Sequence, residues 1–477
     1  MVSKYLIFHP LSDSGWKMST VKIPEKIFRA YDIRGVYGVD ITEETAYLVG
    51  FGFGNMLGKG NVLVVRDVRL SGAMLASAAA DGLMDAGLDV LDGGVCTTPA
   101  GYYGVKHFGA VGCLIVTASH NPPNWNGFKL IRGDGETISQ NAGMEELKQL
   151  ILSNKLRKGG RRGNINTVDL KRAYTDFLKS RFKEMDGLSI GVDFSDGSAT
   201  LIFPEIASYL RIKLKQINDN PDGYFRGHMP EPTPENLGPL AELVRDNGCS
   251  FGTAFDGDAD RAVFVDDLGR IVEGDYALAV LVSNWPERGK VVYDVNSSRA
   301  LKDVAITRGF TPIEWKVGRA FILRKVRDEK AVLGGEKSNH IYFGELDGVD
   351  DAIYATLKMA EIVKNHGGRL SPLVDAIPKY PTLPITVYDC DDEIKFRVVE
   401  KIAEKLEEAG FQISLLDGVK GYISSGWLLI RASNTMPQLK MSAEADSFDE
   451  LEKLRKFGDR LIRETIRQYT KSSQTSS

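Results

Sequence analysis

The sequence predicts an α/β protein of several domains, with three related α/β domains followed by a smaller α+β domain. Its 477 residues exceed what one hydrophobic core normally fills, since domains average about 100–200 residues. Apolar runs of strand length alternate with helical patterns until Pro378, after which the pattern changes. We expect domains at residues 1–165, 166–267, 268–379 and 380–477.

The composition is that of an ordinary globular protein, with 43% hydrophobic residues, 26% charged residues and a formal net charge of −4. This balance does not indicate binding to nucleic acid or to an anionic membrane. No stretch approaches the roughly 18 apolar residues of a membrane helix, and the apolar start is too brief for a signal peptide. We expect a cytoplasmic protein. Its oligomeric state is left open, as is translation from Met1 or Met18.

The four cysteines lie far apart and lack the Cys-x-x-Cys spacing of metal and redox sites. The last three sit in or beside apolar runs that are typical of strands. We therefore expect buried free thiols, which suit a reducing compartment, at Cys96, Cys113, Cys249 and Cys390.

The first domain opens with a helix that Thr42 caps, with two glutamates in its first turn, and that continues to about Gly58. Alternating strands and helices follow at 61–65, 72–86, 89–91 and 110–116. These continuous apolar runs suit parallel strands that are covered on both faces. The glycines from Gly50 to Gly54 are not a dinucleotide-binding motif, because they lie inside a helix and precede a strand. We interpret them as close-packing positions.

Two further α/β units and a different C-terminal unit follow. Their strands are expected at 188–193, 291–295, 331–334 and 385–387, with a hairpin-like stretch at 420–445. The last helix opens with a capping box from Ser447 to Glu450 and then repeats apolar residues on one face. That helix is structural.

A candidate nucleophile, Ser119, directly follows an apolar strand in Thr-Ala-Ser-His-Asn-Pro-Pro. A strand end is where α/β folds place their chemistry, although a bare Ser-His pair is more often only a polar turn. A Gly-x-Ser-x-Gly elbow is absent, and a histidine directly after a serine, here His120, normally points away from it. Lys129 strengthens the functional interpretation, because its ammonium could neutralise a phosphorylated serine or exchange protons with a sugar hydroxyl.

A cluster of carboxylates follows the apolar strand at 251–255, with three aspartates at alternate positions: Asp256, Asp258 and Asp260. Such a cluster can converge on one hard cation, and without a cation it would be strongly repulsive. A calcium EF-hand is excluded, because Arg261 and Asp267 replace its glycine and glutamate. We expect magnesium, which would also accept an oxygen from the phosphorylated nucleophile, with Arg261 balancing charge. The alternative is a solvated acidic turn.

Two weaker loops follow later strands. Glu336, Ser338 and His340 offer the donors and acceptors that vicinal sugar hydroxyls require, but an ordinary polar turn is equally compatible with them. In Arg-Ala-Ser-Asn-Thr-Met-Pro, Arg431 and two hydroxyls would make an anion cradle. A plain hairpin turn would not need the arginine.

In order, the loops Thr-Ala-Ser-His-Asn-Pro, Asp-Gly-Asp-Ala-Asp-Arg, Gly-Glu-Lys-Ser-Asn-His and Arg-Ala-Ser-Asn-Thr-x-Pro resemble the four active-site loops of the α-D-phosphohexomutase family. The phosphomannomutase/phosphoglucomutase branch is most similar. The resemblance extends over nearly the whole chain from about Pro24 and includes the segment from Phe28 to Gly35.

The resemblance implies a fold and a reaction. Four domains would surround a central cleft. Hexose 1-phosphate and hexose 6-phosphate, of mannose or glucose, would interconvert through a phosphoserine and a hexose 1,6-bisphosphate. One Mg2+ per active site is implied as cofactor, and hexose 1,6-bisphosphate as activator.

The resemblance also implies roles for individual residues. Ser119 would carry the phosphoryl group and, with the three aspartates, hold the metal. Charge stabilisation and proton transfer would fall to Arg34, His120, Lys129 and Arg261. Substrate binding would fall to Arg319, Glu336, Ser338, His340, Arg431, Ser433, Asn434 and Thr435.

Three positions depart from the family pattern. Arg319 stands where bacterial phosphomannomutases tend to have histidine, Asn296 where some have lysine, and Asn339 where glycine is usual. These departures leave phosphoryl transfer intact and the identity of the sugar open. The alternatives are a phosphoglucosamine mutase, a sugar-phosphate phosphatase that uses the same serine and metal, and a binding protein that has lost catalysis.

Overall fold

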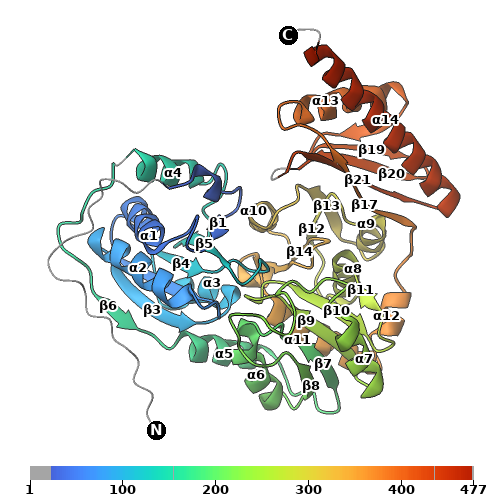
Figure 1. Cartoon of the computed structure of the whole chain (residues 1–477). Coiled ribbons are helices and arrows are strands. Elements are labelled where there is room, and N and C mark those ends of the chain that lie inside the picture. Colours follow the sequence, from blue (N-terminus) through green and yellow to red (C-terminus); the bar gives the residue numbers. More distant parts are fainter. Residues whose placement is uncertain (1–22, 154, 434–435, 475–477) are drawn as a thin grey trace.

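A computed structural model describes residues 23–153, 155–433 and 436–474. Both proposed start residues, Met1 and Met18, lie outside the described residues. The described residues form four sheets in succession along the chain, which Figure 1 shows from blue to red. No helix among the described residues is long and apolar enough to cross a membrane.

The first sheet has six strands in the order β1-β5-β4-β2-β3-β6. The strands β4, β2, β3 and β6 run parallel, whereas β5 and β1 run antiparallel to their neighbours. The strands are β1 (Ile33–Val36), β2 (Asn61–Arg66), β3 (Asp89–Val95), β4 (Gly112–Val116), β5 (Trp125–Arg132) and β6 (Ile165–Thr167). The helices are η1 (Glu25–Ile27), α1 (Glu43–Leu57), α2 (Gly72–Asp85), α3 (Thr98–His107) and α4 (Met144–Leu152).

Helices cover both faces of this sheet, as the continuous apolar runs predict. Val62 and Val64 of β2 pack in one cluster with α1, α2 and α4, whereas Leu63 and Val65 pack on the opposite side with α3. Thr42 caps α1 by accepting a hydrogen bond from the Thr45 amide. The predicted close packing of the helical glycines is confirmed, because a Cβ on Gly50 would lie 2.1 Å from a backbone oxygen of α2.

The second and third sheets have five strands each, in the orders β11-β10-β9-β7-β8 and β13-β12-β14-β15-β16. The second contains β7 (Ser189–Asp193), β8 (Lys213–Ile217), β9 (Phe251–Phe255), β10 (Ala262–Asp266) and β11 (Ile271–Val272), with α5 (Leu170–Arg181), η2 (Ser198–Leu201), α6 (Phe203–Tyr209) and α7 (Gly238–Asp246). The third contains β12 (Lys290–Asp294), β13 (Thr311–Trp315), β14 (Leu333–Gly335), β15 (Ile341–Phe343) and β16 (Val349–Asp350). Its helices are α8 (Gly274–Asn284), α9 (Arg299–Thr307), α10 (Arg319–Glu329), η3 (Gly344–Leu346), α11 (Ala352–Asn365) and α12 (Ser371–Asp375).

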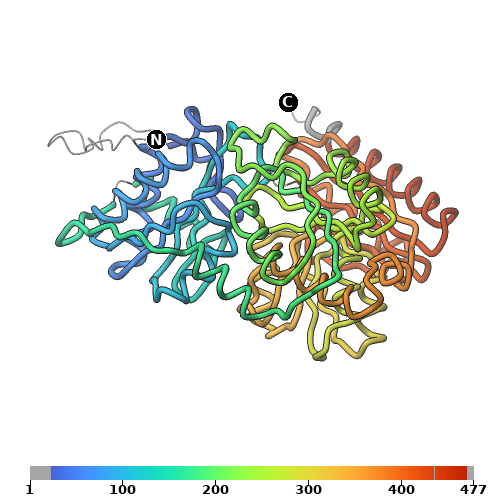
Figure 2. Tube along the Cα trace, turned by 90° about the horizontal axis from the view of Figure 1, so that it is seen from below, coloured from blue at the N-terminus to red at the C-terminus, as the bar shows by residue number. Residues whose placement is uncertain are grey.

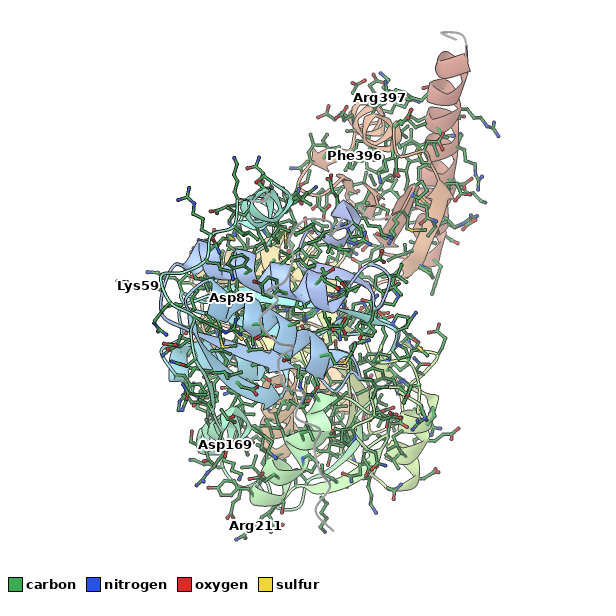
Figure 3. All side chains as sticks on the ribbon, turned by 60° about the vertical axis from the view of Figure 1, so that its left-hand side comes forward. Lys59, Asp85, Asp169, Arg211, Phe396 and Arg397 are labelled. Atoms are coloured by element: carbon green, nitrogen blue, oxygen red, sulfur yellow. The ribbon has the colours of Figure 1, made fainter. Side chains whose placement is uncertain are left out.

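The fourth sheet is wholly antiparallel, in the order β17-β21-β20-β19-β18. It contains β17 (Thr382–Asp389), β18 (Gln412–Ser414), β19 (Val419–Ile423), β20 (Gly426–Ala432) and β21 (Gln438–Ala445), with α13 (Lys395–Glu408) and α14 (Phe448–Gln474). In α13, Val398 and Val399 are buried, whereas Phe396 and Arg397 lie on the outer surface, as Figure 3 shows. The predicted architecture of three α/β domains and one α+β domain is confirmed.

The hydrophobic core is divided unequally among the domains. One large cluster runs through the first three domains and includes Leu63, Ile190 and Val291, whereas the fourth domain has its own cluster beneath α13 and α14. Figure 2 shows the first and fourth domains at opposite ends, with the second and third between them. All four cysteines are buried and free, as predicted. The first three domains therefore share one large cluster, and the first and second domains each have a further cluster of their own.

Candidate active site

The serine loop after β4 and the aspartate loop after β9 are in direct contact. Ser119 Oγ donates a hydrogen bond of 2.9 Å to Asp256 Oδ2. A Cβ on Gly257 would lie only 2.8 Å from the carbonyl oxygen of Ser119, so a larger residue would push the two loops apart. The candidate nucleophile and the first candidate metal ligand thus meet across two domains.

The serine has a left-handed backbone, with φ of 50°. Only a minority of residues other than glycine adopt this conformation, and it reverses the local direction of the chain. As a result, His120 Nδ1 lies 3.2 Å from Ser119 Oγ. The expectation that this histidine points away from the serine was wrong for that reason. Burial, together with Arg261 and Arg34, holds the pKa of His120 well below its ordinary value.

The three aspartates converge as their spacing predicts. Oxygens of Asp256, Asp258 and Asp260 lie within 4.8 Å of one another, and all three side chains are buried. The amides of Asp260 and Arg261 both donate to Asp256 Oδ1 at 3.1 Å, which folds the loop around that carboxylate.

Two oxygens of this trio, Asp258 Oδ1 and Asp260 Oδ1, are buried without a hydrogen-bond partner in the described part of the chain. Buried polar atoms almost always have a partner, and unpaired carboxylate oxygens are what a hard divalent cation requires. The donor set therefore fits Mg2+.

Cations from other domains approach the trio. Lys129 Nζ, from β5, lies 2.7 Å from Asp258 Oδ2 and 2.6 Å from Asp260 Oδ2. Arg319 Nε, from α10, lies 3.2 Å from Asp260. Burial raises the pKa of Asp260, but Lys129, His340 and Arg319 outweigh it and hold that pKa well below its ordinary value. Burial and the two neighbouring carboxylates raise the pKa of Asp256 well above its ordinary value.

Several contributors to the site were not predicted. Thr98 Oγ1 donates to Asp258 Oδ2 at 2.5 Å. Both carboxylate oxygens of Asp350 accept hydrogen bonds from the Arg319 guanidinium, at 2.7 and 2.5 Å. Arg319 also donates to the Tyr102 hydroxyl at 2.8 Å, so this arginine joins groups from three domains. Asp350 lies in the short strand β16 next to Asp351, and the sequence around it carries no motif that would have pointed to the site.

The predicted sugar loop is braced by the protein itself. His340 is held between Asp350 Oδ2, 2.7 Å from its Nδ1, and Arg261 Nε, which donates to its Nε2 at 3.0 Å. Glu336 accepts from the Gly318 amide at 2.7 Å and from the Tyr342 hydroxyl at 2.8 Å. Ser338 is exposed.

The remaining predicted residues flank these loops. Arg34 donates to Asn121 Oδ1 at 2.6 Å and so lies beside the serine loop. Arg431 pairs with Asp417 at 2.8 Å, and Ser433 Oγ accepts from the Met436 amide. Two predicted phosphate-binding residues, Asn434 and Thr435, lie outside the described residues.

Comparison with known proteins identifies the family. Sequence profiles of the phosphoglucomutase/phosphomannomutase family match residues 25–158 (alpha/beta/alpha domain I), 172–269 (domain II), 273–380 (domain III) and 391–460 (C-terminal domain). The chain belongs to the phosphoglucomutase/phosphomannomutase family. The predicted enzyme class, a phosphohexomutase, is thereby confirmed.

Sequences related to this mutase align with it over more than nine-tenths of its length. The phosphoglucomutase/phosphomannomutase of Thermococcus kodakarensis is 33% identical over 93% of this chain and 99% of its own. The phosphomannomutase/phosphoglucomutase of Pseudomonas aeruginosa is 34% identical over 92% of this chain and 96% of its own. A crystal structure of a family protein from Burkholderia thailandensis superposes with a TM-score of 0.87 at 30% identity, covering 93% of this chain and 98% of that one.

We predict that Asp258→Asn raises the Mg2+ dissociation constant and lowers turnover, each by about tenfold or more, because one anionic ligand is lost from a site of three. Metal titration of activity checks both values. Asp246→Asn, which changes an exposed acid at the end of α7, is the matched control and should leave both unchanged. If Asp258→Asn has the same metal dependence as the control, the trio is only an acidic turn.

Proposed function

We propose that this phosphohexomutase moves phosphate between C1 and C6 of glucose and mannose through phosphorylated Ser119 and a hexose 1,6-bisphosphate. The hydrogen bond between Ser119 and Asp256 carries the proposal, because it places the nucleophile of one domain against the aspartate trio of another. A phosphoryl carrier next to a cation site is what phosphoryl transfer requires.

One Mg2+ per active site would be held by Asp256, Asp258, Asp260 and an oxygen of phosphorylated Ser119. Its chemistry is to neutralise the charge that develops on the transferring group. Lys129 is fixed between two of the aspartates and so acts as a stabilising charge close to the serine. Arg34 and Arg261 add positive charge on either side, and His120 is close enough to Ser119 Oγ to exchange a proton with it.

The substrate is held by the other two loops. Glu336, Ser338, His340 and Arg319 are proposed for the sugar, and Arg431, Ser433, Asn434 and Thr435 for the distal phosphate. Arg431 is paired with Asp417 in this structure, so phosphate binding would exchange one anionic partner for another. The bisphosphate then turns around, and the same cradle holds whichever phosphate is not reacting.

Hexose 1,6-bisphosphate also serves as activator in this proposal. If the intermediate leaves before it turns around, Ser119 remains dephosphorylated and must be loaded again from free bisphosphate. The net charge of −4 and the four free, buried thiols support a cytoplasmic enzyme without nucleic-acid partners.

We predict that Ser119→Ala lowers mutase turnover by at least about a hundredfold, because the phosphoryl carrier is lost. Glucose 1-phosphate should still bind with an affinity within about threefold of wild type, since the sugar and phosphate loops are unchanged. A coupled assay and calorimetry measure the two quantities. Near wild-type turnover would exclude Ser119 as the carrier.

The same assay separates the rival functions. A phosphatase would release inorganic phosphate without forming the isomer, and a binding protein would do neither. Intact mass of the wild-type protein after incubation with hexose 1,6-bisphosphate adds an independent readout, since only a phosphoryl-carrying enzyme gains a phosphate that Ser119→Ala lacks.

We also predict that the specificity constants for mannose 1-phosphate and glucose 1-phosphate lie within about a hundredfold of each other. The site must bind the sugar in two orientations that exchange its ends. A dedicated contact to O2 would help one half-reaction and hinder the other, and these sugars differ only at O2. Parallel kinetics decide the point, with glucosamine 1-phosphate as the comparison. A preference beyond about a thousandfold would show that O2 is read directly.

A further inference from the structure

Arg69 lies behind the serine loop, in the turn between β2 and α2, and its side chain is completely buried. A guanidinium has five N–H donors. In this structure each finds an acceptor: Nε donates to Asp67, and the two terminal nitrogens donate to the carbonyls of Ser119, Asn121, Pro122 and Trp125, at distances between 2.5 and 3.2 Å. One side chain therefore gathers four backbone carbonyls of the serine loop.

The partner of Arg69 holds the same loop from its other side. Asp67 Oδ2 accepts from Thr117 Oγ1 at 2.6 Å, and this hydroxyl oxygen accepts from the Ser119 amide at 2.8 Å. Asp67 Oδ1 also accepts from the Arg69 amide at 2.9 Å. The N–H and the C=O of Ser119 are thus both tied to one buried ion pair, Asp67–Arg69.

This attachment matters because the conformation of Ser119 is unfavourable by itself. Its left-handed backbone, with φ of 50°, persists only where the surroundings over-determine it. The same conformation places Ser119 Oγ against Asp256. A relaxed loop would move that oxygen away from the aspartate trio.

The second domain completes the enclosure. The guanidinium carbon of Arg69 lies over the ring of Phe225, 5.0 Å from the ring centre. A Cβ on Gly257 would lie 2.8 Å from the Ser119 carbonyl oxygen. The arginine is therefore held by the ion pair, by the loop and by the neighbouring domain. Its donors are all used by these partners, so it donates no hydrogen bond to the three aspartates.

We propose that Arg69 is a positioning residue for phosphoryl transfer: it fixes Ser119 Oγ beside the aspartate trio without itself contacting the substrate. The inference rests on the proposed role of Ser119 as the phosphoryl carrier. Lysine is no substitute, because its single nitrogen has three donors and lacks the planar fork that spans the carbonyls.

The test compares Arg69→Lys with the wild-type enzyme and with Arg66→Lys, a control of the same chemistry at the end of β2. The rate at which hexose 1,6-bisphosphate phosphorylates Ser119 is followed by rapid quench and intact mass, and KM, kcat and the Mg2+ dissociation constant are measured alongside. We expect Arg69→Lys to slow loading and kcat by about tenfold to a hundredfold, since a displacement of about 1 Å costs that much. KM and the metal constant should stay within about twofold, and Arg66→Lys should match wild type. Loading at the wild-type rate, or a loss that appears equally in KM and metal affinity, would overturn the proposal.

A second variant covers the case in which Arg69→Lys does not fold. Thr117→Val keeps the shape of the side chain and removes only the hydroxyl between Asp67 and the Ser119 amide. We expect loading slowed by about tenfold in protein that still unfolds in one cooperative transition, at a lower melting temperature because Asp67 and the Ser119 amide each lose a buried partner. A wild-type loading rate in this variant would overturn the proposal. If the wild-type enzyme itself is never phosphorylated on Ser119, it is the proposed function that fails.

Discussion

Three carboxylates buried on one short loop repel one another unless positive charge reaches them. Two like charges 4 Å apart cost roughly 4 kcal/mol at an effective dielectric constant of 20, so the loop of Asp256, Asp258 and Asp260 does not close by itself. The second domain holds the aspartates, and much of the compensating charge comes from its neighbours. Lys129 reaches in from the first domain and Arg319 from the third. Charge compensation therefore fixes how these domains meet.

The hydrophobic core, like the charges around the aspartates, joins the first three domains. One hydrophobic cluster runs through the first three domains, and the ionic junction lies where their loops meet. The fourth domain has its own core. Its contacts with the third domain include a small cluster of Val295, Trp427 and Leu429 and the pair of Lys420 with Glu314, 2.6 Å apart. The first three domains thus share a hydrophobic cluster and surround Ser119 and the aspartate trio. The fourth domain, which carries the loop predicted to bind phosphate, thus has a core separate from the cluster that the other three share.

Local chemistry could be predicted from the sequence, and so could the approach of Ser119 to the aspartates, but the other contacts between distant segments could not. The capped helix from Thr42, the glycines of α1 and the convergence of the aspartates all follow from spacing and residue type within one segment. The orientation of His120 did not follow, because it depends on the left-handed backbone of Ser119, which loops from two domains impose. Likewise, the sequence predicts only a substrate-binding role for Arg319. Its partners Asp350, Tyr102 and Asp260 come from three other segments and are visible only in the fold.

We propose that phosphorylated Ser119 and the aspartate trio form one metal site. Anomalous scattering from Mn2+ in crystals of the enzyme loaded with hexose 1,6-bisphosphate tests it most directly, since Mn2+ accepts the same oxygen ligands as Mg2+. A second group of possible ligands, Asp260, His340 and Asp350, lies next to the trio and gives the experiment a real alternative. We predict one anomalous peak, coordinated by Asp256, Asp258, Asp260 and an oxygen of phosphoserine 119. A peak among Asp260, His340 and Asp350, or a phosphorylated serine with no metal beside it, would contradict it.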